Sequence, residues 1–275
     1  MRPRNKSGLD EPSGEAEVGI ALEQVSEQET GPKENLSEQV SNIDAGLSIQ
    51  ELCTLGLSYW QRFKQFGNLE DLDKSIEHAS RAVELAPDDH PNKPLLIADL
   101  GVSFTHRFQH LGELDDLNKS IEHKTHAVAL TADSHPNMPL LLANLVISYT
   151  DRFRHLGELD DLEIIIGLES RALVLTPDGH PDMSKRLTNL GVSYSVRFQR
   201  LGNLDDLDKS IEHKAHTVAL TPDDHPDMPL LLANLTVSYT DRFRHLGELD
   251  DLNKSIEHGL CATTIDFGIW LGLMI

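Results

Sequence analysis

The stretch from Pro94 to Met138 reads PLLIADLGVSFTHRFQHLGELDDLNKSIEHKTHAVALTADSHPNM, and related stretches recur along the chain every 45 residues. Glycines mark this interval at Gly67, Gly112, Gly157, Gly202 and Gly247. His-Pro dipeptides keep the same step and begin at His90, His135, His180 and His225. Five repeats therefore begin near Ile49, Pro94, Pro139, Ser184 and Pro229, and the fifth loses register after His258.

The first half of the quoted repeat has the apolar spacing of a helix. Its large apolar residues follow a period of 3.6 and not of 2: Leu96, Ile97, Leu100, Phe104 and Phe108. Pro94 suits the first turn of a helix, and Gly112 suits the left-handed cap after its end. The sequence therefore predicts a first helix of about 17 residues.

A second helix follows the glycine. Asp115 and Asp116 place negative charge at its start, where we expect them to cap the helix and to meet the positive end of its dipole. The loop that ends each repeat contains proline, which breaks any continuation. One such hairpin cannot bury both of its faces, but stacked copies cover one another. The predicted fold class is all-α, an α-solenoid of stacked antiparallel helical hairpins.

These repeats resemble the tetratricopeptide repeat (TPR). The first-helix pattern of that family matches Ile97, Leu100, Gly101 and Phe104, and again Leu187, Leu190, Gly191 and Tyr194. Its second-helix pattern matches Ser75, Ala82 and Pro87. The resemblance covers residues 46–258 and implies a TPR-like superhelix. The third repeat departs from the pattern, because Ile165 replaces the small residue and Gly167 lies inside the helix, which should weaken that hairpin.

The long repeat also resembles a narrower group, the TPR arrays of fungal proteins that precede a caspase-like CHAT domain. This likeness is based on segments such as Gly202-Asn203-Leu204-Asp205-Asp206-Leu207. It suggests an alternative function, in which the array is the sensory or regulatory part of a fungal CHAT-type protease or signalling protein whose effector domain is absent from this chain.

Two terminal segments do not follow the repeat. Residues 1–45 contain ten acidic and four basic residues without a sustained period, which predicts a disordered acidic arm. Residues 259–275 form a divergent apolar tail, and the abrupt change is typical of a truncated or mispredicted gene end. No stretch has the 18 or so consecutive apolar residues of a membrane-spanning helix.

Composition narrows the classes of function. The 275 residues include 24 Lys and Arg against 45 Asp and Glu, a net charge of −21, which disfavours nucleic acid as a partner. Cys53 and Cys261 are the only cysteines, so the sequence does not support a disulfide framework, and a reducing, cytoplasmic setting is expected. Most of the 14 histidines recur with the repeat, which favours structural roles over a metal site. We expect no catalytic residues, no metal and no cofactor.

The candidate site lies on the first helices. The TPR resemblance implies that three recurring positions line a concave peptide groove. The first position holds Asp99, Asn144, Asn189 and Asn234, the second Val102, Ile147, Val192 and Val237, and the third Thr105, Thr150, Ser195 and Thr240. Asn has both a donor and an acceptor, so a row of them suits the backbone of an extended peptide. An equally simple interpretation is that each Asn bonds a neighbouring helix.

The predicted function is therefore a non-enzymatic protein-interaction scaffold that binds a peptide or a partner domain in this groove. The negative charge favours a neutral or basic partner. Neither a nucleic acid nor a membrane is expected, and the sequence leaves the oligomeric state open.

Overall fold

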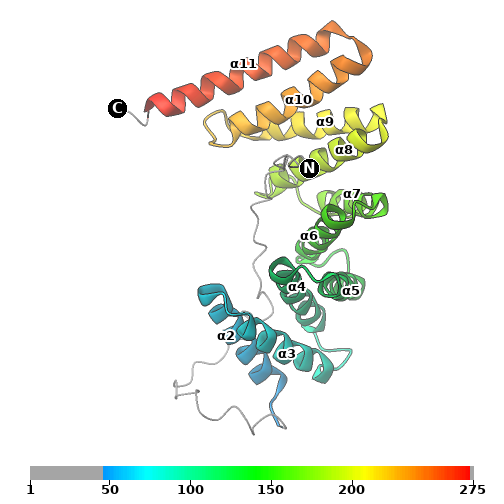
Figure 1. Cartoon of the computed structure of the whole chain (residues 1–275), viewed down its shortest axis with the longest axis vertical. Coiled ribbons are helices and arrows are strands. Elements are labelled where there is room, and N and C mark those ends of the chain that lie inside the picture. The colour runs from blue at the N-terminus through cyan, green and yellow to red at the C-terminus, as the bar shows by residue number, and fades with distance from the viewer. Residues whose placement is uncertain (1–45, 273–275) are drawn as a thin grey trace, which may run out of the picture. The chain divides into compact units, whose positions relative to one another are not determined.

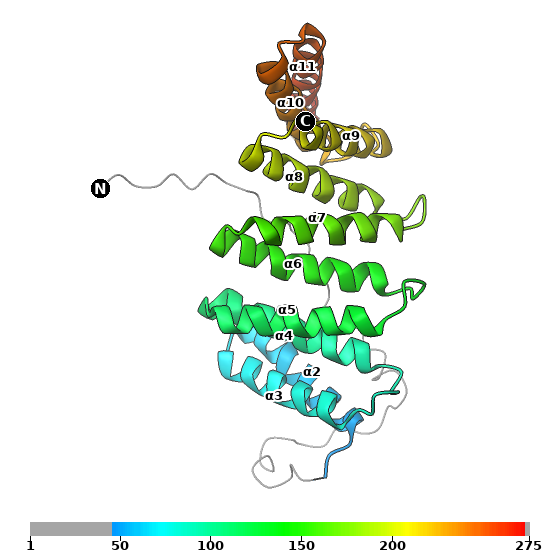
Figure 2. The same ribbon diagram turned by 90° about the vertical axis from the view of Figure 1, so that its right-hand side faces the viewer.

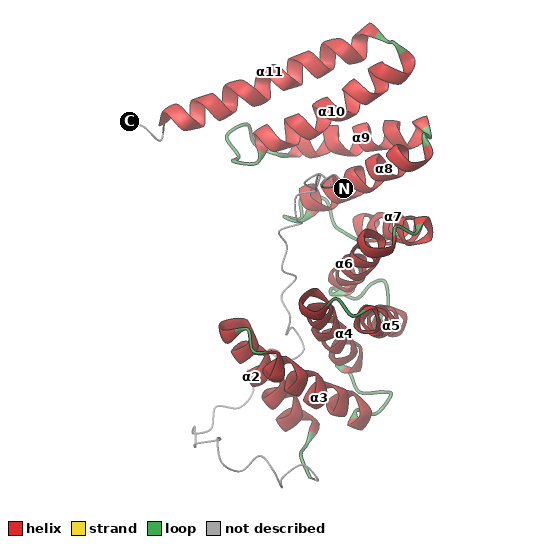
Figure 3. Ribbon diagram, viewed as in Figure 1, coloured by secondary structure: helices red, strands yellow, loops and turns green. Residues whose placement is uncertain are grey.

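The computed structural model describes residues 46–272, with side chains as far as Thr263. The predicted arm, residues 1–45, lies outside the described residues, as do residues 273–275. Within the described part the chain contains helices and loops and no strand (Figure 3). The predicted all-α class is confirmed.

The helices follow one another as long elements joined by short loops (Figure 1). Their bounds are α2 (Ile49–Phe66), α3 (Leu69–Leu85), α4 (Lys93–Leu111), α5 (Leu114–Leu130), α6 (Met138–Leu156), α7 (Leu159–Val174), α8 (Met183–Leu201), α9 (Leu204–Leu220), α10 (Met228–Leu246) and α11 (Leu249–Gly272). Each repeat therefore supplies one pair of helices.

The chain divides into two compact units near the end of α5, between Ala127 and Val128. The first unit contains α2 to α5 and the second contains α6 to α11. In each unit, the two helices of a repeat lie side by side, and the second helix of one repeat packs on the first helix of the next (Figure 2). Successive helix pairs pack in this way in TPR-like solenoids.

A glycine ends every first helix, as the spacing predicted. Gly67, Gly112, Gly157, Gly202 and Gly247 all have φ between 69° and 75°. This left-handed conformation strains any residue with a Cβ. The cap N–H of Gly112 donates to the carbonyl of Phe108, and the same bond recurs in the other repeats. The helices beginning at Lys93 and Met138 have 19 residues, slightly more than predicted, because each starts one residue before its proline.

Within each unit, an apolar cluster joins a hairpin to the first helix of the next repeat. In the first unit, Trp60, Phe63, Leu72, Ile76, Leu100 and Phe104 form one such cluster. In the second unit, Phe198, Leu207, Ile211, Leu235 and Tyr239 form another. Because each of these two clusters draws on three helices, both hairpins depend on the following helix for burial.

The helices continue through two places where the sequence departs from the repeat, one in α7 and one in α11. Gly167 does not interrupt α7, and Ile165 is buried within that helix. α11 continues through His258 to Gly272. Ala262, a residue of the divergent tail, is buried in a cluster with Met228 and Leu232. The helix therefore extends well beyond the point where the repeat pattern stops.

Candidate functional site

The paired aspartates hold the hairpin together and do not cap its second helix. The second Asp of each pair is buried, and it binds the Arg that lies nine residues before it. Nε and Nη2 of Arg107 donate to the two oxygens of Asp116, at 2.9 and 2.6 Å. The same pairing joins Arg152 to Asp161. Capping in α3 and α9 comes from the preceding asparagines, Asn68 and Asn203. This replaces the expectation that the aspartates are caps.

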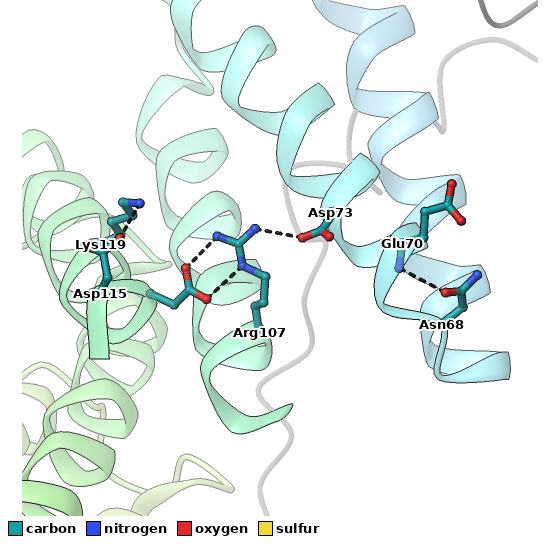
Figure 4. Close-up of polar contacts among 7 residues, drawn as sticks. Asn68, Glu70, Asp73, Arg107, Asp115 and Lys119 are labelled. Atoms are coloured by element: carbon teal, nitrogen blue, oxygen red, sulfur yellow. Dashed lines mark hydrogen bonds and ion pairs between the residues drawn. The ribbon is translucent and has the colours of Figure 1, made fainter. Parts of the chain in front are cut away.

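The same arginine also joins adjacent repeats. Nη1 of Arg107 donates to Asp73 on α3 at 2.8 Å, so one guanidinium connects α3, α4 and α5 (Figure 4). In the second unit, Arg197 and Arg242 make the corresponding bonds to Glu163 and Asp208. The first Asp of the pair is exposed, and in α5 and α11 it binds the Lys one turn later, Asp115 to Lys119 and Asp250 to Lys254. The second Asp of each pair is therefore engaged in a structural ion pair.

Recurring histidines pack against aromatic rings. His123 stacks on Phe104 at 5.5 Å and His213 stacks on Tyr194 at 5.7 Å, measured between ring centroids. Burial lowers the pKa of both histidines, which favours the neutral imidazole. In the loops, Nδ1 of His90 accepts the N–H of Asn92, and the other His-Pro turns repeat this bond. In the part of the chain described, no three His, Cys, Asp or Glu side chains form a group that could hold a metal ion.

The predicted Asn row is only partly open to a ligand. Asn144 is buried in α6, whereas Asp99, Asn189 and Asn234 are half-buried. Asp99 belongs to the first unit and the three asparagines to the second. Asn189 and Asn234 therefore remain the most accessible members of this row in the second unit.

The apolar row becomes more exposed along the chain. Val102 is buried in the first unit and Ile147 is half-buried in the second. Val192 and Val237 are exposed, at 38% and 54%. These two valines are apolar side chains on the surface of first helices, at the positions expected to form a groove floor.

Three members of the hydroxyl row, Thr105, Ser195 and Thr240, bond across their hairpins. Thr105 is buried, and its Oγ1 lies 2.7 Å from Oγ of Ser120 on α5. Ser195 pairs in the same way with Ser210, and Thr240 with Ser255. Thr150 is half-buried. Because their bonding serves the hairpin, we do not include these hydroxyls in the groove.

A small cleft opens beside two predicted groove residues of the second unit. Its lining combines α8, α9 and α10 and consists of Thr188, Val192, Lys214, Thr217, Leu231 and Asn234. Lys214 is nearly fully buried, and burial lowers its pKa to about 8. No sequence motif singled out this lysine, although Glu169 takes its place one repeat earlier.

Comparisons with known proteins agree with this architecture. No family model matches the sequence, and no curated protein matches it. The crystal structure of MamA matches with a TM-score of 0.51 and 15% identity, covering 75% of this chain and 94% of that one. A putative kinesin light chain from Podosopora anserina, described as nearly identical TPR-like repeats, matches with a TM-score of 0.53 and 13% identity over 75% of this chain and 94% of its own. The fold is TPR-like.

BtubC (BKLC) from P. vanneervenii matches with a TM-score of 0.51 and 14% identity, covering 81% of this chain and 91% of that one. At such low identities the likeness concerns the fold alone. It supports the TPR part of the expected resemblance and gives no support to the narrower CHAT-associated part. No helix in the described part of the chain is both long and apolar enough to cross a bilayer.

Proposed function

We propose that the chain is a non-enzymatic protein-interaction scaffold, and that the first-helix surface of its second unit binds an extended peptide or a segment of a partner domain. TPR-like repeats commonly serve as such scaffolds, so the fold supports this general role. The observation on which the proposal depends is the pair of exposed valines, Val192 and Val237, beside half-buried Asn234 and the cleft between α8 and α10.

The chemistry of this surface suits a peptide. Apolar side chains of the ligand would bury the valines, and each Asn amide can donate to a backbone carbonyl and accept from a backbone N–H. The net charge of −21 favours a neutral or basic ligand and disfavours nucleic acid.

The proposal can be tested by selecting displayed random peptides on the immobilised full chain. Selected peptides should lose at least about tenfold in affinity for the Val192→Asp and Val237→Asp variants, because a charge on the floor must be desolvated on binding. Leu201→Asp is the matched control, since Leu201 is a similarly exposed apolar residue at the end of α8. Equal binding to all forms, or failure to select any peptide, would rule out this surface as the site.

The CHAT-associated alternative remains a prediction from sequence. It would be supported by a CHAT-like domain encoded in frame downstream of this array in the gene.

A further inference from the structure

Within each unit, a second helix buries an apolar stripe against the first helix of the next repeat. In α9 this stripe packs against Leu235 and Tyr239 of α10, and its members are Leu204, Leu207, Ile211, Ala215 and Val218. The clusters between α3 and α4 and between α7 and α8 have the same arrangement. A leucine and an aromatic residue four positions later on a first helix are therefore what covers the stripe.

The stripe continues on α11, and no helix follows α11 among the described residues. By the 45-residue step its members there are Leu249, Leu252, Ile256, Leu260 and Thr263. Ile256 is 52% exposed, whereas the isoleucines at the same place in α3, α7 and α9 are each 6% exposed. Leu249 and Leu260 are exposed as well. α11 therefore presents on its surface the apolar face that α3, α7 and α9 bury.

α2 has the other half of this contact. Leu55 and Tyr59 stand where α10 has Leu235 and Tyr239, and no helix precedes α2 in the described part of the chain. Leu55 is only half-buried, whereas the leucines at the same place in α4, α8 and α10 are buried. The leucine of the pair is thus left partly uncovered on α2.

Two polar residues of α2 mark the same uncovered surface. Ser58 is exposed, whereas Ser238 at its place in α10 is buried and accepts from Nζ of Lys214 on α9 at 2.8 Å. The side chain of Arg62 is 55% exposed. The arginines at its place, which also bind an acid of the preceding repeat, are 15–22% exposed: Arg107, Arg197 and Arg242.

A charged residue on this surface of α2 is compatible with helix packing. Glu51 stands where α4 has Leu96 and α8 has Arg186. α8 packs on α7 in spite of that arginine, through the apolar cluster that includes Leu190 and Tyr194.

We propose that a second copy of this chain covers the exposed stripe of α11, with α2 of that copy in the place of a next first helix. The contact extends the interface that already joins α3 to α4, α7 to α8 and α9 to α10. Because it joins two different faces, it is head-to-tail, and each copy keeps a face for a further copy. It uses neither Val192 nor Val237, so it is separate from the proposed peptide surface.

Sedimentation velocity of the full chain, from micromolar to near-millimolar concentration, tests this contact. Wild type should self-associate, and more strongly at high salt, because two copies of net charge −21 repel each other. Ile256→Asp on α11 and Ser58→Arg on α2 should each weaken the association at least about tenfold, since each buries a charge in the contact. Both replaced residues are exposed in the single chain, and the two changes alter the net charge in opposite directions.

A mixture of the two variants decides the geometry. Ile256→Asp keeps an intact α2 and Ser58→Arg keeps an intact α11, so an equimolar mixture should associate again. Leu201→Asp, a change at an exposed apolar residue outside both faces, should behave as wild type.

A wild type that stays monomeric at every concentration and salt would overturn the proposal. Normal association of Ser58→Arg together with loss in Ile256→Asp would also overturn it, because α11 would then pair with α11 of the second copy. Circular dichroism of each variant identifies any loss that is due to unfolding.

Discussion

The hairpins α6–α7 and α8–α9 are successive repeats of the second unit, and they solve the same packing problem differently. In α8–α9, Gly191 faces Ser210, whose Oγ donates to the Gly191 carbonyl at 2.8 Å. A Cβ on Gly191 would come within 3.0 Å of Cγ of Lys214 and 3.3 Å of the carbonyl oxygen of Ser210. In α6–α7 the same two places hold Val146 and Ile165, both buried.

The Arg–Asp ion pair that joins the two helices of a hairpin, here called the polar clip, does not vary between these hairpins. Arg152 binds Asp161 and Arg197 binds Asp206, each at 2.6 Å for the shortest contact. The Arg–Asp pair is therefore common to both hairpins, whereas the contact between the two helices is made by two small residues in α8–α9 and by two apolar residues in α6–α7. The position one turn later on the second helix also differs: it holds Glu169 in α7 and Lys214 in α9.

The largest effect should come from breaking the shared clip. Asp161→Ala and Asp206→Ala should each lower the free energy of unfolding by about 3–5 kcal/mol, because each leaves a largely buried arginine without its bidentate partner. Urea denaturation followed by circular dichroism measures both. Asp208→Ala, which removes an exposed partner of Arg242, should cost less than about 1 kcal/mol. Clearly unequal costs for Asp161 and Asp206 would mean that the clip is not the invariant feature of the two hairpins.

Opposite pH dependences should distinguish Glu169 from Lys214. The pKa of Glu169 is raised from 4.5 to about 7 by burial, so the folded chain keeps a proton that the unfolded chain releases. Stability relative to Glu169→Gln is therefore greatest below pH 4.5 and is lost as the pH rises through 7, by about 3 kcal/mol.

The pKa of Lys214 is lowered from 10.5 to about 8 by burial. Stability relative to Lys214→Met is therefore fully present above pH 10.5 and is lost as the pH falls through 8. Denaturation curves between pH 4 and pH 10 test both signs. Parallel curves for wild type and Glu169→Gln would contradict the burial of an ionisable carboxyl at this position.

Exchanging the helix-contact residues should affect the two hairpins unequally. Gly191→Val should destabilise the chain by about 1–3 kcal/mol, because the added methyl groups meet Lys214 and the backbone of Ser210. The matched residue Val146 already fills this place in α6 without such a neighbour as Ser210. Thermal denaturation measures the change, and a neutral Gly191→Val would show that α9 moves easily away from α8.

The smallest expected effect is a gain in stability from a substitution within α7. A Cβ on Gly167 would meet no atom within 4 Å, and this glycine is exposed in the middle of the helix. Gly167→Ala should therefore stabilise the hairpin by about 0.5–1 kcal/mol through helix propensity alone. Hydrogen exchange of the α7 amides should slow accordingly. A loss of stability would indicate that α7 needs the flexibility of glycine at this point.

The fold could be predicted from sequence because its determinants are local and repeated. Apolar spacing, Gly112 after the first helix and proline in the loop each act within a few residues. The site could be predicted only in part. Val192 and Val237 are exposed at the expected positions, but Thr105 faces Ser120 across the hairpin, and a position in a repeat does not reveal which neighbour covers a side chain.

Sequence by itself determined the helix pairs, their length and the 45-residue step, since these follow from periodicity and from the conformational limits of glycine and proline. Only the tertiary structure decided what each polar group binds. From the sequence, Asp116 is only an acidic residue at the start of a helix. The structure shows that its carboxylate accepts hydrogen bonds from Arg107 and so joins the two helices of the hairpin. Glu169 stands where the next repeat has Lys214, and only the structure shows that Oε2 of its buried carboxylate has no hydrogen-bond partner among the residues described.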